Sequence, residues 1–201
     1  MQPDRCYRRQ DLLPSIPAGA CGVDEAGRGP LAGPVMAAAV MVTDQDLSWV
    51  RDSKQVSPAQ RMRWADRIRQ EMPYAVASAS AEEVDRLNIF QATLLAMRRA
   101  VNALSVMPSG LWVDGLHAPS MDLPTCAVVQ GDQRMGIISA ASILAKVARD
   151  EYMVQLASTF PEYGFERHKG YGSAFHLDAL RRHGPCAEHR RSFEPLKSAL
   201  R

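Results

Sequence analysis

Short apolar runs separated by glycine, proline and polar residues make up most of the first half of the chain. Residues 20–25 are apolar up to two acidic positions, and a Gly/Pro-rich turn joins them to an Ala- and Val-rich run at 35–42. Two apolar runs that flank such a turn predict neighbouring strands. Residues 74–80 alternate weakly, and short apolar runs recur at 111–114 and 126–130, so three further strands are expected.

Helical signals lie between these strands and continue toward the C-terminus. Ser57 followed by Pro58 combines an N-cap with proline at the first helical position, which predicts a helix ending near residue 72. Ser80, with Glu83 three residues later, has the pattern of a capping box and predicts a short helix. Longer helices are expected over residues 88–104 and 137–160, and another from Ser173 to the stop signal Gly184–Pro185.

The order of these elements, three strands and then strands alternating with helices, predicts an α/β fold with a mixed sheet covered by helices. A helical C-terminal part, from about residue 137, is expected to pack against one side. The 201 residues suit one domain with a short appendage. We expect residues 1–18, which are polar and contain three prolines, to form a loosely ordered leader, and residues 19–201 to form the single domain.

Composition adds few constraints on function. Apolar residues make up 46% and charged residues 23% of the chain, and its net charge of +2 does not by itself indicate a nucleic-acid-binding protein. Basic residues gather near the C-terminus, where they could form either a solvated surface or a phosphate-contacting patch. This cluster comprises Arg181, Arg182, Arg190, Arg191 and Lys197, with His183 and His189 among them.

Cysteine usage and apolar segments bear on the cellular compartment. Cys6, Cys21, Cys126 and Cys186 form no C-x-x-C pair and no zinc-like spacing with histidine, so reduced thiols are expected. The polar N-terminus lacks the apolar core of a signal peptide, and no segment approaches the roughly 20 apolar residues of a membrane span. We therefore expect a soluble, cytoplasmic protein.

Adjacent carboxylates at Asp24 and Glu25 end the first predicted strand. Burying an unpaired charge is costly, so a purely structural role would need a cation such as Arg28 nearby. The functional alternative is a site for a hard cation, because Mg²⁺ and Mn²⁺ prefer carboxylate oxygens. Both interpretations stay open for this pair alone.

Two further aspartates follow apolar strands. Asp114 ends the run at 111–114, and Asp132 comes shortly after the run at 126–130. Either residue alone could cap a turn. If the three strands are neighbours, however, four carboxylates converge at one edge of the sheet, where they would repel one another without divalent cations.

A glycine-rich segment and a serine–lysine pair are the next candidates. Residues 27–33 lack the ending of a Walker loop and the spacing of a dinucleotide-binding loop, so they predict either a tight turn or bare backbone that a substrate strand can approach. Ser142 lies four residues before Lys146 on a predicted helix. That spacing allows a nucleophilic pair, but an ion pair between Lys146 and Asp150 is the commoner arrangement.

Two loops combine cations with small residues. In the segment 168–172, Tyr171 could anchor the loop or stack on a sugar or base, and Lys169 could lie near a phosphate. The segment 52–54, Asp-Ser-Lys, predicts either a plain surface turn or a phosphate contact through Lys54.

Together these segments resemble ribonuclease HII, the bacterial type 2 ribonuclease H family. They span nearly the whole chain in the family's order, which makes the resemblance specific although no single block would suffice. The matching blocks are GVDEAGRGPLAGPV at 22–35, DSK at 52–54, VDG at 113–115, GD at 131–132, ISAASILAKVARD at 138–150, HKGYG at 168–172 and HRRSF at 189–193.

The resemblance implies a ribonuclease H-like mixed sheet with a helical C-terminal extension, and it assigns roles to single residues. The family's glycine–arginine–glycine motif, which senses the ribose 2′-hydroxyl through the backbone, and its junction-sensing tyrosine both have counterparts here. The acids that bind metal and catalyse fall on Asp24, Glu25, Asp114 and Asp132. The substrate contacts fall on Gly27, Arg28, Gly29 and Tyr171, and Lys54, Lys146 and Lys169 are expected to join them.

The implied activity is hydrolysis of the RNA strand of RNA–DNA hybrids and cleavage at ribonucleotides embedded in duplex DNA. The reaction would use two Mg²⁺ or Mn²⁺ ions, ~4 Å apart. The cleavage would leave 3′-hydroxyl and 5′-phosphate ends. The alternatives are a non-catalytic hybrid-binding module, which gains nothing from acids facing phosphates, and another ribonuclease H-like DNA nuclease, which has no use for a 2′-hydroxyl sensor. A monomer is expected, and no protein partner is indicated.

Overall fold

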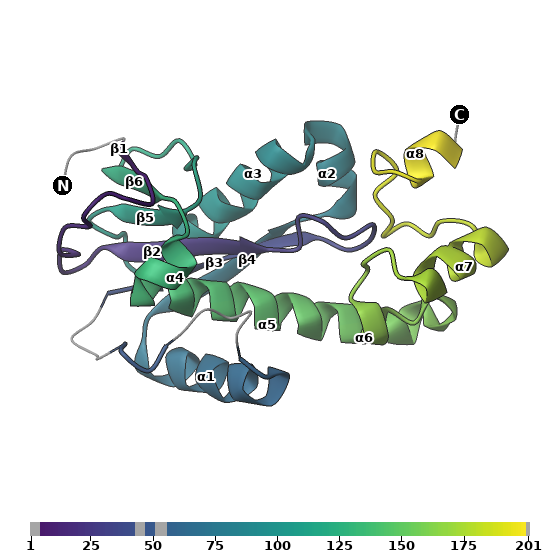
Figure 1. The fold of residues 1–201 in the computed structure, drawn as a ribbon, viewed down its shortest axis with the longest axis horizontal. Helices are drawn as coiled ribbons and strands as arrows, with labels where there is room; N and C mark the ends of the chain where they lie inside the picture. The colour runs from purple at the N-terminus through teal and green to yellow at the C-terminus, as the bar shows by residue number, and fades with distance from the viewer. Residues whose placement is uncertain (1–4, 43–46, 51–55, 200–201) are drawn as a thin grey trace.

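A computed structural model of the chain describes residues 5–42, 47–50 and 56–199 and contains a six-stranded mixed sheet with helices on both faces (Figure 1). The strands are β1 (Arg5–Tyr7), β2 (Cys21–Ala26), β3 (Val35–Met41), β4 (Tyr74–Ala79), β5 (Leu111–Asp114) and β6 (Thr125–Val128). Their order in the sheet is β1-β6-β5-β2-β3-β4. The first four strands in this order run parallel, whereas β3 is antiparallel to β2 and β4, so the mixed sheet expected from the sequence is confirmed.

Alternation of side chains along the central strands explains why both faces are covered. In β3, Ala38 and Val40 join one apolar cluster, whereas Ala37 and Ala39 join the other. The first cluster lies under α1 (Pro58–Glu71) and α5 (Gly136–Thr159), and the second lies under α2 (Ala81–Leu87) and α3 (Ile89–Asn102) (Figure 1).

Several helices start where capping residues predicted them to start. Ser57 Oγ accepts a hydrogen bond from Gln60 N at the beginning of α1. Ser80 and Glu83 form the reciprocal capping box of α2, and Asn88 caps α3 through its side chain. These local bonds satisfy backbone N–H groups that have no partner inside the helix.

The long helix α5 lies directly on the centre of the sheet because small residues line the contact. A Cβ atom built on Gly22 of β2 would lie 2.6 Å from the backbone carbon of Ile137, so only glycine fits where the helix crosses this strand. Ala140 and Ala141 of α5 are fully buried in the same cluster. The close approach brings the middle of α5 beside the acidic end of β2.

Two segments differ from the expectation. Residues 5–7 fall in the expected loose leader, yet they form β1, which pairs in parallel with β6, and Tyr7 is buried against Trp112. Strand pairing and one buried ring thus order this part of the leader. The strand expected to reach residue 130 ends at Val128, and a short helix, α4 (Gly131–Arg134), follows it.

The remaining helices lie beyond the far end of α5 (Figure 1). They are η1 (Pro161–Tyr163), α6 (Phe165–His168), α7 (Ala174–His183) and α8 (Leu196–Ala199), and a third apolar cluster lies among them. After α7 the chain returns to the glycine-rich turn, where Arg190 N donates to Leu31 O at 2.8 Å. None of the helices in the described ranges is long and apolar enough to cross a membrane.

Candidate active site

Three carboxylates meet at the edge of the sheet where β2 and β5 end. Because these parallel neighbours align Val23 with Val113, the residues that follow them, Asp24 and Asp114, reach the same edge. Both acids line a cavity of about 300 Å³ together with Glu25, as the strand ends predicted. The other lining residues are Ala26, Gly27, Arg28, Gly29, Arg61, Ser142, Lys146, Arg149 and Tyr171.

Burial and mutual repulsion govern the ionisation of these acids. Asp24 is only 4% exposed, and burial, followed by the charges of Glu25 and Asp114, raises its pKa well above the ordinary value. A hydrogen bond from Ser142 opposes this shift. Burial also raises the pKa of Glu25, while Arg28, whose Nη1 lies 3.4 Å from Glu25 Oε1, lowers it. The cavity therefore favours whatever neutralises its negative charge, a proton or a cation.

Asp132 lies next to this group, although its side chain is not among those that line the cavity. It is buried in the first turn of α4, and its backbone N–H donates to Asp114 Oδ1 at 3.2 Å. Its carbonyl accepts a hydrogen bond from Ser139 Oγ of α5. The sequence had indicated a strand end for this fourth acid. The structure instead places Asp132 in a short helix, from which it reaches Asp114.

The donor set fits a hard divalent cation. Its members are carboxylates, the ligands that Mg²⁺ and Mn²⁺ prefer, and a bound cation would relieve the repulsion that raises the pKa of Asp24. No three His, Cys, Asp or Glu side chains among the described residues already form a complete metal-ligand group. The carboxylates of Asp24, Glu25 and Asp114 would therefore have to turn toward a shared ion.

A glycine turn and an aromatic ring face each other across the cavity. Gly27 has a φ of +94°, a conformation that side chains rarely adopt, and it begins the turn that leads to Gly29. A Cβ atom on Gly29 would lie 3.7 Å from Cε1 of Tyr171, whose side chain is half exposed. The two loops are also joined directly, since Leu31 N donates to Gly170 O at 2.8 Å. The residues expected to read the sugar therefore stand beside the acids.

Comparison with known proteins agrees with this geometry. The profile of the ribonuclease HII family matches residues 21–195. Ribonuclease HII of Verminephrobacter eiseniae (strain EF01-2) is 56% identical over 191 residues, which cover 94% of this chain and 91% of that protein. Ribonuclease HII of Thiobacillus denitrificans (strain ATCC 25259 / T1) is 53% identical over 195 residues, which cover 96% of each. The chain belongs to the ribonuclease HII family.

The fold comparison reaches the same family. The crystal structure of the ribonuclease H2 from Pyrococcus horikoshii OT3 resembles this ribonuclease HII with a TM-score of 0.75 and 25% sequence identity. The similarity covers 89% of this chain and 95% of that one. The ribonuclease H-like sheet with a helical C-terminal extension, expected from the sequence, is therefore confirmed.

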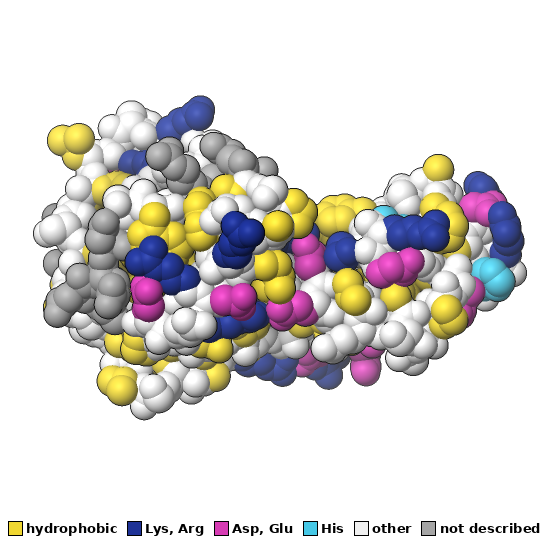
Figure 2. All heavy atoms as spheres, turned by 90° about the horizontal axis from the view of Figure 1, so that it is seen from below, with side chains coloured by type: hydrophobic (Ala, Val, Ile, Leu, Met, Phe, Trp, Pro, Cys, Tyr) yellow, Lys and Arg dark blue, Asp and Glu magenta, His cyan; other side chains and the backbone are white. Residues whose placement is uncertain are grey.

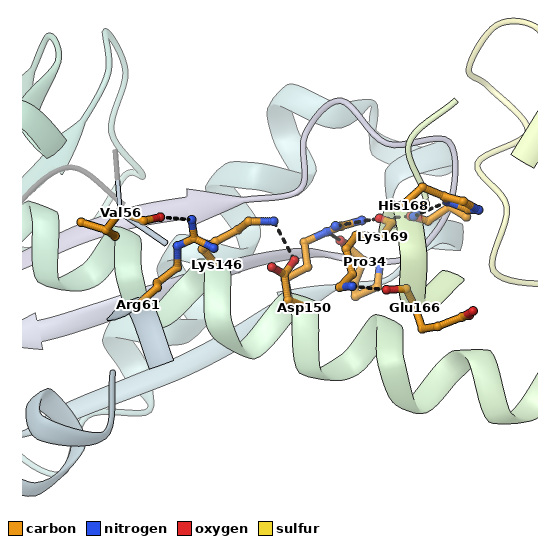
Figure 3. Close-up of polar contacts among 11 residues, drawn as sticks. Pro34, Val56, Arg61, Lys146, Asp150, Glu166, His168 and Lys169 are labelled. Atoms are coloured by element: carbon orange, nitrogen blue, oxygen red, sulfur yellow. Dashed lines mark hydrogen bonds and ion pairs between the residues drawn. The ribbon is translucent and has the colours of Figure 1, made fainter. Parts of the chain in front are cut away.

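Four basic residues line the cavity of this ribonuclease HII: Arg28, Arg61, Lys146 and Arg149. Two of them, Lys146 and Arg61, come from two different helices (Figure 3). Lys146 of α5 places Nζ 2.6 Å from Asp150 Oδ1, so the ion pair favoured by the sequence is present. Arg61 of α1 donates to Val56 O at 3.1 Å. Arg61 was not predicted from the sequence, because its position depends on how α1 packs against α5 and no local motif marks it.

Of the two other lysines expected to contact substrate, Lys169 does not line the cavity. Lys169 adopts a positive φ of 52°, and its Nζ donates to Glu166 O, as Figure 3 shows. Lys54, with the rest of the Asp-Ser-Lys segment at 52–54, lies outside the described residues.

The basic C-terminal cluster separates into two sets. Arg181 and Arg182 are exposed and pair with Asp178 of the same helix. Arg190 and His189 are instead fully or almost fully buried, so neither alternative for the cluster, a solvated surface or a phosphate patch, holds for them. On the face formed by α1 and α5, acidic and basic side chains are likewise interspersed rather than gathered by sign (Figure 2).

Proposed function

We propose that this ribonuclease HII hydrolyses the RNA strand of RNA–DNA hybrids and also cuts at single ribonucleotides within duplex DNA, leaving 3′-hydroxyl and 5′-phosphate ends. The observation that supports it best is the placement of Asp24, Glu25 and Asp114 in one cavity with a glycine turn and Tyr171. The acids suit phosphodiester chemistry, and the turn and ring suit recognition of a sugar. A non-catalytic hybrid-binding module would be weakened by carboxylates that face the phosphates.

Four acids are proposed to hold divalent cations, Mg²⁺ or Mn²⁺, with two ions present once substrate is bound. Asp24, Glu25 and Asp114 line the cavity, and Asp132 stands behind Asp114 as a ligand that joins them. When bound, such ions supply a more acidic water and neutralise charge on the phosphate oxygens. Ser142 orients Asp24 by hydrogen bonding to its carboxylate, which keeps that acid directed into the cavity.

Recognition of RNA is proposed to depend on the 2′-hydroxyl, the group that distinguishes the two sugars. The backbone at Gly27, Arg28 and Gly29 would bind this hydroxyl, because glycines leave the peptide groups open to a close approach. Tyr171 would pack on the deoxyribose that follows, where a second hydroxyl would clash. Lys146 and Arg61 would lie near the phosphates, since both line the cavity. The protein is proposed to act as a monomer.

A cleavage panel tests these proposals. End-labelled RNA–DNA hybrid, an all-DNA duplex and a DNA duplex with one ribonucleotide are incubated with Mg²⁺, Mn²⁺ or EDTA, and the product ends are mapped. We expect both ribonucleotide-containing substrates to be cut with either metal, and neither with EDTA. Binding without cutting would favour the hybrid-binding module, and efficient cutting of the all-DNA duplex would favour a ribonuclease H-like DNA nuclease.

A further inference from the structure

Arg190 is a buried arginine whose side chain donates hydrogen bonds to four backbone carbonyls. It is 0% exposed and lies in the segment that returns from α7 to the glycine turn. Its Nε donates to Gly33 O at 2.9 Å, and its Nη2 donates to Gly27 O at 2.6 Å. Its Nη1 donates both to Arg28 O at 3.0 Å and to Pro30 O at 2.9 Å. One guanidinium thus gathers four carbonyls of the turn that begins beside the acids.

Burying this charge is expensive, which indicates that the arrangement does more than stabilise the fold. The four acceptors are neutral carbonyls, and burial together with the charge of Arg149 lowers the pKa of Arg190 to about 9. An apolar side chain of similar volume would avoid the cost of desolvation. It would not hold the carbonyls in fixed directions, as the planar fork of an arginine does.

The direction of the carbonyls determines the direction of the neighbouring amides. In a trans peptide unit the N–H points opposite to the C=O. Because Arg190 holds the carbonyls of Gly27 and Arg28, the N–H groups of Arg28 and Gly29 point away from the guanidinium. Both of these residues line the cavity, and Gly29 faces Tyr171.

A second arginine supports the same turn from α5. Arg149 donates to the carbonyls of Pro34, Ala32 and Lys169, so it connects the turn with the loop that carries Tyr171. A Cβ atom on Gly27 would lie 2.0 Å from Arg149 Nε, which shows how closely the turn rests on this side chain. Arg149 links the two loops, whereas Arg190 sets the peptide directions at Gly27–Gly29.

We propose that Arg190 is a positioning residue for ribose recognition: by holding the carbonyls of Gly27, Arg28, Pro30 and Gly33, it orients the amides of the turn toward the 2′-hydroxyl of the substrate. This inference rests on the proposed function, because it takes the turn to be the part of the protein that reads the ribose.

The test compares binding to two duplexes that differ by one hydroxyl. In an Asp24→Asn background, Kd is measured for a DNA duplex with a single ribonucleotide and for the same duplex made entirely of DNA. The preference for ribose is the Kd for the all-DNA duplex divided by the Kd for the ribonucleotide duplex. We expect Arg190→Gln and Arg190→Lys to reduce this ratio by about tenfold, while Kd for the all-DNA duplex changes little. Lysine keeps the charge but cannot donate to four carbonyls, so its failure to restore the ratio separates geometry from charge.

The matched controls are Arg191→Gln and Arg191→Lys, at the exposed neighbouring arginine, which should leave the ratio unchanged. The parent is the Asp24→Asn protein with Arg190 unchanged. If Arg190→Lys folds in this background and keeps the ratio of the parent, the inference is wrong. If the parent itself shows no preference for the ribonucleotide and the wild-type protein cuts no hybrid, the proposed function fails instead.

A structure of the Asp24→Asn protein with the single-ribonucleotide duplex supplies a test that does not depend on the folding of an Arg190 variant. We expect an amide of the turn to donate to the 2′-hydroxyl while Arg190 still binds the four carbonyls. A turn that releases Arg190 when substrate binds, or a 2′-hydroxyl held by other groups, would overturn the proposal.

Discussion

Asp24 is buried beside two other carboxylates, where a neutral side chain would be more stable. Asp24→Asn should therefore lower the cleavage rate at saturating Mg²⁺ by more than about 10³-fold, because one ligand loses its charge. The Kd for hybrid should change little. In EDTA the free energy of unfolding of the variant should be about 1 kcal/mol higher than that of the wild type, because the repulsion of Asp24 by Glu25 and Asp114 is removed. Turnover close to that of the wild type would refute the assignment of Asp24.

Tyr171 offers a second test at the level of single residues. Its side chain is 49% exposed, so replacing it should have little effect on stability. Tyr171→Ala should reduce cleavage at a single ribonucleotide by about tenfold or more, because a stacking contact is worth roughly 1–3 kcal/mol. Cleavage of a long hybrid should fall less, and Tyr171→Phe, which keeps the ring, should retain most of the activity. Equal losses on both substrates would contradict a role at the junction.

Among the elements, those with local signals could be predicted from the sequence. The Ser57 cap, the capping box at Ser80 and the short apolar runs gave the positions of α1, α2 and the central strands, because these signals act within a few residues. The convergence of Asp24 with Asp114 also followed, since parallel neighbouring strands end at the same edge.

What the sequence did not reveal depends on distant partners. β1 has three residues and is ordered by pairing with β6, more than a hundred residues away along the chain. Arg190 belongs to a run of basic residues that suggested a surface, and its burial depends on carbonyls 157 to 163 residues earlier. Arg61 enters the cavity only because of how α1 packs. No window of neighbouring residues contains these contacts.

The contact between α5 and β2 gives a prediction for elements. A methyl group at Gly22 would meet the backbone of Ile137 at 2.6 Å, so Gly22→Ala should push the helix away from the strand. Overpacking of this kind costs about 1–3 kcal/mol, which thermal or urea denaturation would measure. Because Ser142 on α5 hydrogen-bonds Asp24, activity measured well below the melting temperature should fall as well. Unchanged stability would show that the helix can shift without cost.

A chain of histidines ties α7 to the returning C-terminal segment. Cys186 N donates to His189 Nδ1 at 3.0 Å, which leaves the proton of this ring on Nε2, 3.0 Å from His176 Nε2. His176 then donates through Nδ1 to Tyr171 O at 2.9 Å. The chain requires both rings to be neutral, because an added proton would turn the acceptor nitrogen of either ring into a donor.

Burial, and then the charge of His176, lowers the pKa of His189 to about 4. Between pH 6.5 and about 4 the unfolded state thus binds more protons at this residue, so its contribution to stability is complete above pH 6.5 and is lost as the pH falls. We expect a loss of roughly 3 kcal/mol from this ring over that range. His189→Gln, which keeps an N–H donor near Nε2 but does not titrate, should flatten the pH dependence of the unfolding free energy. An equally steep dependence in the variant would contradict the assignment.

For the whole molecule, function and stability are linked through the charge of the cavity. The face formed by α1 and α5 mixes acids and bases (Figure 2), and the net charge is only +2. Three carboxylates, by contrast, stand together in the cavity at the sheet edge. A cation that binds the folded protein and not the unfolded chain raises stability by RT ln(1 + [L]/Kd). Divalent ions should therefore stabilise the protein even without nucleic acid.

We expect Mn²⁺ or Mg²⁺ at about one hundred times its Kd to raise the free energy of unfolding by roughly 2.7 kcal/mol, seen as a higher melting temperature that EDTA reverses. Asp24→Asn should lose most of this increase, because the neutral amide of asparagine is a weaker ligand than the carboxylate of Asp24. Arg191→Gln, on the exposed surface, should show the full increase. If the wild type and Asp24→Asn are stabilised equally, the ions bind elsewhere, and the cluster of Asp24, Glu25 and Asp114 is not the metal site.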